Sequence, residues 1–471
     1  AVMQPIEIPD ELARLIDAVK NTGRPYVVGG SVRDWLLGQT PHDFDIEVFG
    51  TDYEKLRNVL AKFGPTEVVG KSFGVVKVRI GENEYDFALP RRERKTGSGH
   101  RGFEVEPDPS LTLAEAAARR DFTINAIAWD PLSGEFIDPT GGRADLERKC
   151  LRHVGPAFSE DPLRVLRGFQ LASRFDLTMA PETIELCRSI HATFAELPTE
   201  RIWHEWEKWA AQSIVPSRGI EVLEATGWIE HFPQLAALKD CPQDPEWHPE
   251  GDVLTHTKLC LDSLVRIPAW QKASRNHRAL LTFAVLIHDF GKAVTTEVAE
   301  KRGRLRTISP GHDKAGAEMV GPFLDSIGAP KAFAKFIRPL VRNHMIHIHA
   351  ADSLKPATVR RLAARLSPAT IEDLAILMTA DLRGRRPNDF SKHPLVNTLL
   401  EAAREMEIEK NAPKPLILGR DLIDHGLEPG PHFGKILKKL FEAQLEGDFT
   451  DKEEGLAYLD ELLRERNEEN D

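Results

Sequence analysis

The run YVVGGSVRDWLLG at residues 26–38, followed by DFDIEV at residues 43–48, decides the fold of the first part of the chain. An apolar run ends in a double glycine, a helix-like segment follows, and two carboxylates then stand two residues apart on a strand-like stretch. Residues i and i+2 of a strand point to the same face, so Asp43 and Asp45 can share a divalent cation or a pair of them. Glycines let the backbone approach a phosphate without an intervening side chain. The stretch therefore predicts a metal site beside a phosphate cradle, as used in phosphoryl or nucleotidyl transfer.

Length and composition describe an ordinary globular chain with room for several domains. It has 471 residues, of which 41% are hydrophobic and 29% are charged, and chains of this length usually fold as more than one domain. No apolar run is long enough to cross a membrane and no signal peptide opens the sequence, so we expect a cytoplasmic protein with no membrane partner. The four cysteines are far apart without CxxC spacing, which predicts reduced thiols and neither a disulfide framework nor a cysteine metal site.

The charge is negative overall but uneven along the chain. The formal net charge is −11, whereas nucleic-acid-binding domains usually carry a basic face. Basic clusters occur at residues 91–95 and 119–120 and at Arg164, Arg167 and Arg174. The overall charge therefore speaks against a nucleic-acid partner, while the clusters allow a local basic groove.

Strand and helix signals divide the chain into an α+β beginning and a helical remainder. Strand-like runs between residues 25 and 90 predict a small mixed sheet. The polar stretch 91–112 is expected to be a long mobile loop, since loops of that length in compact domains are usually functional or disordered. From about residue 156 the strand signals nearly vanish. The domains that we expect are a head at residues 1–155, a helical neck at 156–235, a second helical domain at 236–395 and a helical tail at 396–471.

Two further segments of the head carry side chains suited to a nucleoside triphosphate. RRDFTINA at residues 119–126 places two guanidiniums and an amide together, and the arginine fork binds phosphate oxygens in pairs. Asp86, on another strand-like run, can supply a third carboxylate, because two metals about 3.5–4 Å apart need roughly three such ligands. In that arrangement one Mg²⁺ would activate a 3′-hydroxyl and the other would stabilise the leaving pyrophosphate.

The stretch EDPLRVLR at residues 160–167 predicts a helix that recognises a nucleotide base. Ser159 and Pro162 are typical of a helix start, and Asp161 and Arg164 would lie three residues apart on one face. A carboxylate accepts a hydrogen bond from an exocyclic amine, and a guanidinium donates one to the adjacent ring nitrogen. Cytosine and adenine both present an amine beside an acceptor nitrogen, whereas uracil and guanine present the reverse. Such a pair would select C and A without a nucleic-acid template.

Together with VVGKSFGVVKV at residues 68–78 and DPTGGRADL at 138–146, these runs follow the order found in a known family. The series resembles the motifs of the bacterial class II tRNA nucleotidyltransferases, the CCA-adding enzymes, over residues 26–167. The resemblance implies a polymerase-beta-like head with Mg²⁺ as its cofactor, followed by an all-α neck. It also implies untemplated addition of C, C and A to the tRNA 3′ end from CTP and ATP. The stretch 91–112 matches the family's flexible loop, which accompanies the switch from C to A addition.

The resemblance and the motifs assign roles to individual residues of the head. Metal binding falls to Asp43 and Asp45, which with Asp86 form the predicted catalytic set. Gln170 stands where many relatives have another arginine, so a phosphate or base contact there would be weaker, and we leave it outside the predicted site. The residues expected to contact the nucleotide are Gly29, Gly30, Arg33, Arg120, Asp121, Asn125, Asp161, Arg164 and Arg167.

Several alternatives stay open for the head. A bacterial poly(A) polymerase shares much of it, although residues 69–76 lack the double basic pair and the aromatic pattern associated with those enzymes. An enzyme that adds only A is a second alternative, while the stretch 91–112 disfavours one that adds only CC. A non-catalytic RNA-binding protein is disfavoured by the intact Asp43 and Asp45. The oligomeric state is open between a monomer and a homodimer.

The second helical domain carries histidines and aspartates in a metal-binding order. His288 and Asp289 end an apolar run, His256 precedes them, and Asp381 follows. Imidazole and carboxylate together suit divalent ions such as Ni²⁺, Mn²⁺, Co²⁺ or Mg²⁺. These four residues are the predicted ligands. The further candidates are His312 and His344.

The order H…HD…D over residues 252–385 resembles the HD phosphohydrolase superfamily, and one bacterial subgroup of CCA-adding enzymes carries such a domain at this place. The resemblance implies metal-dependent phosphatase, 2′-nucleotidase and 2′,3′-cyclic phosphodiesterase activity. The alternative is a structural domain whose histidines are satisfied core residues.

In the tail, a Gly/Pro turn at residues 426–431 opens a helix with basic residues. That pattern is equally compatible with tRNA contact and with an ordinary helical hairpin.

Overall fold

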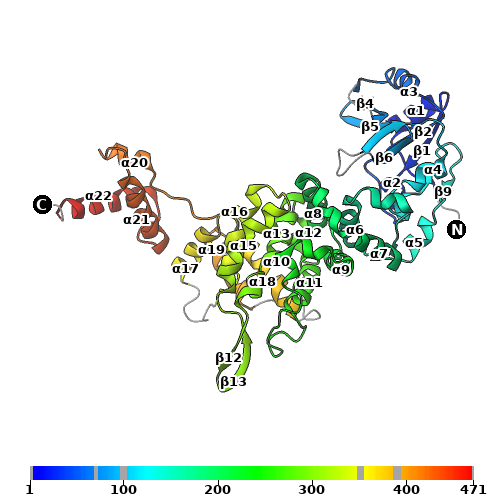
Figure 1. Cartoon of the computed structure of the whole chain (residues 1–471). Coiled ribbons are helices and arrows are strands. Elements are labelled where there is room, and N and C mark those ends of the chain that lie inside the picture. The colour runs from blue at the N-terminus through cyan, green and yellow to red at the C-terminus, as the bar shows by residue number, and fades with distance from the viewer. Residues whose placement is uncertain (1–3, 68–72, 96–102, 347–354, 386–393, 469–471) are drawn as a thin grey trace. The chain divides into compact units, whose positions relative to one another are not determined.

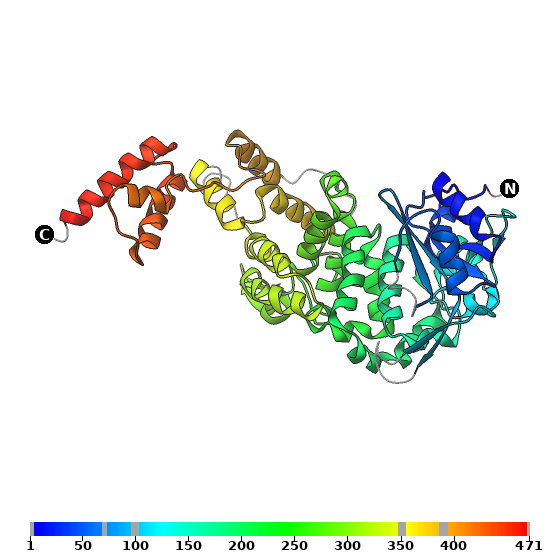
Figure 2. The ribbon, with the colours of Figure 1, turned by 90° about the horizontal axis from the view of Figure 1, so that it is seen from above.

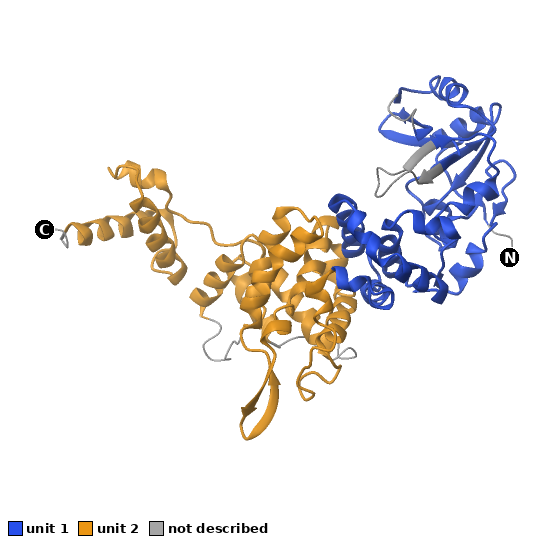
Figure 3. Ribbon diagram, viewed as in Figure 1, with its two compact units in different colours: residues 1–231 blue, residues 232–471 orange. Residues whose placement is uncertain are grey.

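A computed structural model describes residues 4–67, 73–95, 103–346, 355–385 and 394–468 of the chain. The chain divides into two units, residues 1–231 and 232–471 (Figure 3). The large sheet lies in the first unit, and the described part of the second unit is mostly helical (Figure 1). No helix among the described residues is long and apolar enough to span a membrane.

The main sheet of the first unit is mixed, as expected. Its strand order is β3-β4-β5-β2-β1-β8-β9. Within it β2 and β5 are parallel neighbours, and the other neighbouring strands are antiparallel. The strands are β1 Arg24–Val28, β2 Asp45–Phe49, β3 Thr66–Glu67, β4 Val75–Ile80, β5 Asn83–Ala88, β8 Ala128–Trp129 and β9 Phe136–Ile137.

The register of the central strands places the carboxylates beside the double glycine. Val28, the last residue of β1, pairs with Asp45 on β2, and Asp45 pairs with Asp86 on β5. Gly29 directly follows β1 with a φ of 78°, a value that L side chains rarely adopt. A Cβ built on Gly29 would lie 3.7 Å from both Asp45 Oδ2 and Arg120 Nη1. The backbone at Gly29 therefore passes close to the predicted catalytic residues.

Helices surround the sheet and continue beyond it in the first unit. Helix α6 packs against α8 and α9, and the ring of Phe169 on α6 lies 4.6 Å from that of Trp206 and 5.4 Å from that of Trp209, centroid to centroid. The short strands β10 (Cys150–Leu151) and β11 (Thr178–Met179) pair in parallel. The helices are α1 Asp10–Val19, α2 Gly30–Leu36, α3 Tyr53–Leu60, α4 Leu113–Ala118, η3 Thr123–Asn125, α5 Gly142–Glu147, η4 Pro156–Glu160, α6 Leu163–Phe175, α7 Pro181–Ser189, η5 His191–Glu196, α8 Thr199–Gln212, α9 Pro216–Thr226 and η6 Trp228–His231.

The expectation of one long loop at residues 91–112 is wrong. Strands β6 (Arg91–Lys95) and β7 (Phe103–Pro107) form an antiparallel hairpin, and residues 96–102 lie outside the described part. Oppositely charged residues stand across from one another in its register, Arg92 with Glu106 and Arg94 with Glu104. Opposite charges at paired positions stabilise a two-stranded ladder, which explains why a highly charged segment forms strands.

Two expected element boundaries also differ. Strand β2 begins at Asp45, so Asp43 precedes the strand, although exposure still alternates from exposed Asp43 through buried Phe44 to exposed Asp45. Helix α6 begins at Leu163, and Asp161 stands in front of it, where its Oδ1 accepts a hydrogen bond from the Leu163 amide at 3.1 Å. Asp161 therefore lies outside the helix, before the N-cap residue Pro162.

The second unit consists of helices packed side by side (Figure 2). Helix α11 packs against α13 and α18, and α13 packs against α16. The helices are α10 Pro233–Ala236, α11 Val253–Leu264, α12 Pro268–Lys272, α13 Arg275–Ile287, α14 Lys292–Thr295, α15 His312–Ser326, α16 Lys331–Asn343, α17 Pro356–Leu366, α18 Ile371–Arg385, α19 Pro394–Glu405, α20 Gly419–Asp424, α21 His432–Glu446 and α22 Lys452–Glu468.

One segment of this helical unit forms a hairpin that the sequence reasoning missed. Strands β12 (Glu297–Lys301) and β13 (Arg304–Ile308) pair antiparallel around a two-residue turn. Both turn residues have positive φ, 52° at Arg302 and 75° at Gly303, as a type I′ turn requires. The pair Arg302-Gly303 between two strand-like runs was the sequence pattern that indicated this hairpin.

Candidate functional sites

A cavity of about 530 Å³ in the first unit gathers the motif residues of the head. Ligand pockets typically measure roughly 300–1,000 Å³. The lining carries more cationic than anionic side chains, so this part of the chain is basic although the whole chain is acidic. The cationic side chains are Arg33, Arg91, Arg119, Arg120, Arg164, Arg167, Arg174, Arg201 and Lys208, and the carboxylates are Asp45, Glu47, Asp121 and Asp161.

The cavity brings together every predicted nucleotide contact and one of the predicted metal ligands. Asp43 and Asp86 are not part of its lining; Asp86 lies opposite Asp45 in the sheet, and Asp43 is exposed before β2. The predicted residues on the lining are Gly29, Gly30, Arg33, Asp45, Arg120, Asp121, Asn125, Asp161, Arg164 and Arg167.

Two other carboxylates lie near Asp45. Although the residue is partly exposed, desolvation of its carboxyl group raises the pKa, Arg120 lowers it, and the negative charges of Asp86 and Asp43 raise it again. Burial likewise raises the pKa of Asp86, against the opposing charge of Lys77, whose Nζ lies 3.8 Å from Asp86 Oδ1. Carboxylates that repel one another in one place are a donor set that a hard divalent cation such as Mg²⁺ relieves.

A hydrogen-bonded chain connects two arginines of the lining through buried groups. Arg33 Nη1 donates to Asn125 Oδ1 at 2.6 Å, and Asn125 Nδ2 donates to Asp121 Oδ1 at 3.1 Å. The other Asp121 oxygen accepts from Arg167 Nε at 2.6 Å. Burial raises the pKa of Asp121, but the Arg167 charge and these hydrogen bonds outweigh it and hold the pKa at about 2. This series of hydrogen bonds fixes the positions of the guanidinium groups of Arg33 and Arg167.

Both members of the predicted base-recognition pair are engaged by protein groups. Asp161 accepts two hydrogen bonds from Arg201, at 3.0 Å from Nη2 to Oδ2 and at 3.4 Å from Nη1 to Oδ1. Arg164 donates to the backbone oxygens of Ala157 at 2.6 Å and Arg119 at 2.9 Å. A base that binds to this pair must therefore replace contacts that are already made.

Sequence reasoning missed several residues of this cavity. Glu47 stands two residues after Asp45 on the same strand face and accepts a hydrogen bond from Arg120 at 3.2 Å, so the alternation that selected Asp45 could have selected it too. Arg201 comes from α8, far along the chain, and carried no local signal. Gln170, excluded at first, lines the cavity and donates to buried Glu205 at 3.0 Å.

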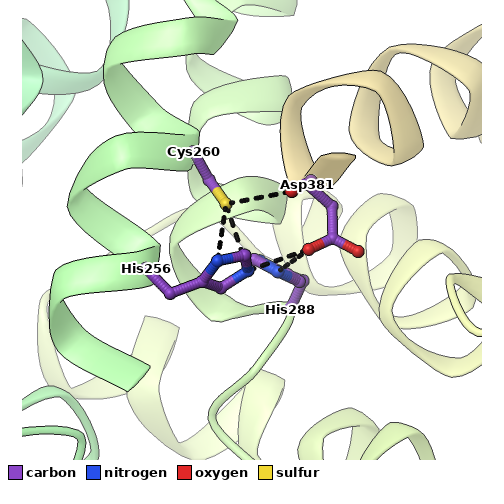
Figure 4. A group of neighbouring side chains, drawn as sticks. All are labelled: His256, Cys260, His288 and Asp381. Carbon is purple, nitrogen blue, oxygen red and sulfur yellow. Dashed lines mark hydrogen bonds and ion pairs between the residues drawn. The ribbon is translucent and has the colours of Figure 1, made fainter. Parts of the chain in front are cut away.

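The second unit brings the four predicted metal ligands to one buried point. His256 Nε2 lies 2.8 Å from Asp381 Oδ1 and 3.4 Å from Asp289 Oδ2, and His288 Nε2 lies 3.3 Å from Asp289 Oδ2 and 3.5 Å from Asp381 Oδ1. Figure 4 shows His256, His288 and Asp381 converging from separate segments. Burial lowers the pKa of His288, but Asp289 and Asp381 raise it to about 10. We call this group the HD centre.

Two buried atoms of the HD centre, His288 Nε2 and Asp289 Oδ2, make no well-aligned hydrogen bond among the described residues and face each other at 3.3 Å. The ammonium of Lys292 lies 3.0 Å from Asp289 Oδ2 and balances part of its charge. Leaving a buried polar group unpaired is costly, whereas a nitrogen and a carboxylate oxygen at this separation can share one cation. The donor set therefore fits a divalent metal.

The further candidates His312 and His344 lie on the other side of Asp289. Their Nε2 atoms are 3.4 Å and 3.6 Å from Asp289 Oδ1 and 3.2 Å from each other. Gly291 makes this possible, because a Cβ there would lie 2.0 Å from the His312 carbonyl oxygen. The two oxygens of Asp289 thus face two separate histidine groups.

Two neighbours of His256 were not predicted. Glu250 Oε1 lies 2.6 Å from His256 Nδ1. Cys260 Sγ lies 3.3 Å from His256 Nε2 (Figure 4), in a centre where we expected no cysteine. Cys260 is one turn from His256 on α11, a spacing that the sequence displayed.

Two family models match the chain, the poly A polymerase head domain over residues 25–152 and the HD domain over residues 254–381. Fold and sites together define a nucleotidyltransferase with an HD domain. The multifunctional CCA protein of Xanthomonas campestris pv. campestris (strain B100) is 37% identical over 425 residues, which cover 88% of this chain and 95% of that protein. The multifunctional CCA protein of Nitrosococcus oceani is 37% identical over 388 residues, covering 80% and 89%. The chain therefore belongs to the multifunctional CCA protein family, which confirms the predicted family.

Solved structures show the same fold. The Bacillus stearothermophilus CCA-adding enzyme in complex with CTP matches with a TM-score of 0.66 at 23% identity, covering 98% of this chain and all of that one. The Thermotoga maritima CCA-adding enzyme complexed with tRNA matches with a TM-score of 0.58 at 19% identity, covering 98% and 99%. The predicted α+β fold class, with a polymerase-beta-like head and an HD domain, is confirmed.

Proposed function

We propose that the head adds CMP and AMP, from CTP and ATP, to the 3′ end of tRNA without a template and so builds or repairs the CCA terminus. The observation that carries the proposal is the single basic cavity that holds both Asp45 and the Asp161–Arg164 pair. One bound nucleotide can therefore contact the carboxylate that serves phosphate chemistry and the pair that selects the base. The names of the relatives support full CCA addition over A-only addition and over poly(A) synthesis.

The carboxylates serve the chemical step in this proposal. Asp45, with Asp43 and Asp86, would hold Mg²⁺, which when bound activates the 3′-hydroxyl and stabilises the leaving pyrophosphate. Gly29 leaves space for a phosphate beside Asp45, and Arg120 lies next to the same carboxylate. Arg120 would bind triphosphate oxygens, since its position opposite Glu47 keeps it at the cavity wall.

Base choice follows from replacing the existing contacts of Asp161 and Arg164. An exocyclic amine can replace the Arg201 donor at Asp161, and an acceptor ring nitrogen can replace a backbone carbonyl at Arg164. Cytosine and adenine supply both groups. Uracil presents a carbonyl to Asp161 and an N–H to Arg164, which leaves polar groups unpaired at a cost of roughly 1–3 kcal/mol each.

Three tRNA substrates test the proposal directly. Purified full-length protein receives tRNA lacking CCA, tRNA ending in C and tRNA ending in CC, with CTP, ATP or both. We expect the first substrate to be extended to full CCA. Addition only to the CC-ended tRNA would show an A-adding enzyme, and long adenosine tails would show a poly(A) polymerase.

For the second unit we propose a metal-dependent phosphohydrolase that acts on 2′,3′-cyclic phosphates, 2′-phosphates and phosphomonoesters. His256, His288, Asp289 and Asp381 would hold the cation, with Ni²⁺, Mn²⁺ and Co²⁺ as the ions to examine first. His312 and His344 would hold a second ion or the substrate phosphate on the far side of Asp289. When bound, the cation would supply an activated water. The convergence of two buried imidazoles with two carboxylates supports the proposal.

Phosphate release from a 2′,3′-cyclic nucleotide in the presence of Ni²⁺ tests this activity. The double variant H288A/D289A should lose it while retaining nucleotidyl transfer. If that variant hydrolyses the substrate as fast as the unmodified protein, the HD centre is not where hydrolysis occurs.

A further inference from the structure

Glu250 is a buried acid that the proposed hydrolysis does not use directly. It lies between α10 and α11, in a segment that looked like a plain linker in the sequence, and its side chain is 2% exposed. Its hydrogen-bond partners are the imidazoles of His248 and His256, and it also interacts with the charge of Arg385. Glutamates are rarely this buried unless they are paired.

One oxygen of Glu250 accepts from two histidines. Glu250 Oε1 lies 2.6 Å from His256 Nδ1 and 2.9 Å from His248 Nδ1. A carboxylate oxygen at this distance accepts a hydrogen bond from an imidazole N–H. The contact therefore places the proton on His256 Nδ1.

That proton decides which nitrogen of His256 faces the HD centre. With Nδ1 donating to Glu250, Nε2 is the nitrogen whose lone pair can bind a cation, and Nε2 is the atom near Asp381 and Asp289. A carboxylate behind a metal-bound histidine fixes the ring and increases its basicity. Glu250 itself lies behind the imidazole, on its Nδ1 side, and does not reach that cation.

We propose that Glu250 is a positioning residue of the HD centre, which holds the imidazole of His256 through Nδ1 so that Nε2 binds the metal. The inference rests on the proposed function of the second unit as a metal-dependent phosphohydrolase. His248 Nδ1 lies 2.9 Å from the same Glu250 oxygen and helps to hold the carboxylate in place.

Metal binding by the full-length protein tests the assignment. Ni²⁺ is titrated in competition with a chromophoric chelator. The Ni²⁺ ion that the unmodified protein binds and H288A/D289A does not bind is assigned to the HD centre, and we call it the HD equivalent. We expect E250A to weaken this equivalent about 10- to 100-fold. E250Q should restore most of the affinity, because its amide oxygen still accepts from Nδ1. E246A, which removes a glutamate of the same segment that pairs with Arg306, is the matched control and should stay within about threefold.

Spectroscopy and folding controls separate orientation from general damage. Co²⁺ at the HD equivalent should show an altered visible absorption in E250A and a spectrum close to that of the unmodified protein in E250Q. Circular dichroism and nucleotidyl transfer by the head should be unchanged in all variants. Normal affinity in E250A, or E250Q as weak as E250A, overturns the proposal.

Stoichiometry distinguishes the remaining outcomes. E250A could lose one bound Ni²⁺ ion while the ion at the HD centre remains bound. That result would show that His248, Glu250 and His256 form a metal site of their own, and it would also overturn the proposal. If H288A/D289A binds as much Ni²⁺ as the unmodified protein, the proposed function itself fails, independently of Glu250.

Discussion

The nucleotide cavity and the HD centre collect charged side chains in opposite ways. The cavity gathers more cations than anions, and its carboxylates Asp121 and Asp161 are held by arginines. The HD centre is buried and brings the imidazoles of His256 and His288 within 2.8–3.5 Å of the carboxylates of Asp289 and Asp381. The first arrangement suits an anionic ligand that replaces existing contacts, and the second, a cluster of lone-pair donors, suits a cation. A site's ligand can thus be inferred from the charge and the donor type of the side chains that the site gathers.

The sharpest separation of the two sites is expected from D45A. Removing the central carboxylate should reduce nucleotidyl transfer by about a thousandfold or more, measured by extension of tRNA lacking CCA. Ni²⁺-dependent hydrolysis in the second unit should not change. D17N on the exposed face of α1 is the matched control, and equal loss in both activities would contradict the separation.

The variant G291A tests the HD centre through packing rather than through charge. The added Cβ would lie 2.0 Å from the His312 carbonyl oxygen, so α15 must move away from the HD centre. Overpacking of this kind costs about 3 kcal/mol at its upper range. We expect a lower melting temperature and weaker Ni²⁺ binding, with nucleotidyl transfer preserved. Unchanged melting would mean that the contact relaxes without cost.

The buried pair in the cavity predicts a pH-dependent stability. The folded-state pKa of Asp121 is about 2, below the ordinary value of about 3.9, so its carboxylate contributes stability above about pH 4 that is lost as the pH falls toward 2. D121N should lower the free energy of unfolding by on the order of 2 kcal/mol at pH 7. Urea unfolding should show this difference shrinking below about pH 4. A constant difference would assign the effect to packing.

The smallest effect is expected at Arg201. R201A removes the two hydrogen bonds that orient the Asp161 carboxylate. The carboxylate can then turn away from the base, so UTP should compete better with CTP. We expect the preference for CTP to fall about tenfold, which corresponds to about 1.4 kcal/mol, while kcat for CTP changes little. Single-nucleotide incorporation with each triphosphate measures it. A preserved preference with lower kcat would instead assign Arg201 to catalysis.

Short-range patterns predicted most of the head and failed where partners are remote. Alternation identified Asp45, and the double glycine was recognised beside it, because both signals lie within a few residues. Arg201 reaches Asp161 across 40 positions, and no local pattern reports such a contact. The hairpin at residues 91–107 was missed because its charges looked like a solvated loop until the partner strand was known.

The HD centre shows the same limit. The four residues predicted as its ligands were selected by their order and chemistry, and the structure brings them together. Glu250 was hidden in a Pro- and Gly-containing segment that resembles a linker, since its role depends on a hydrogen bond to the first turn of α11. The division into four domains stays a prediction.

The boundary after His231 has an evolutionary consequence. Every lining residue of the cavity precedes it, and His256, His288, Asp289 and Asp381 of the HD centre follow it. Mutations in the HD centre can therefore accumulate without altering the residues that line the cavity. A lineage can lose or exchange its HD domain by drift or recombination while its tRNAs still receive correct ends.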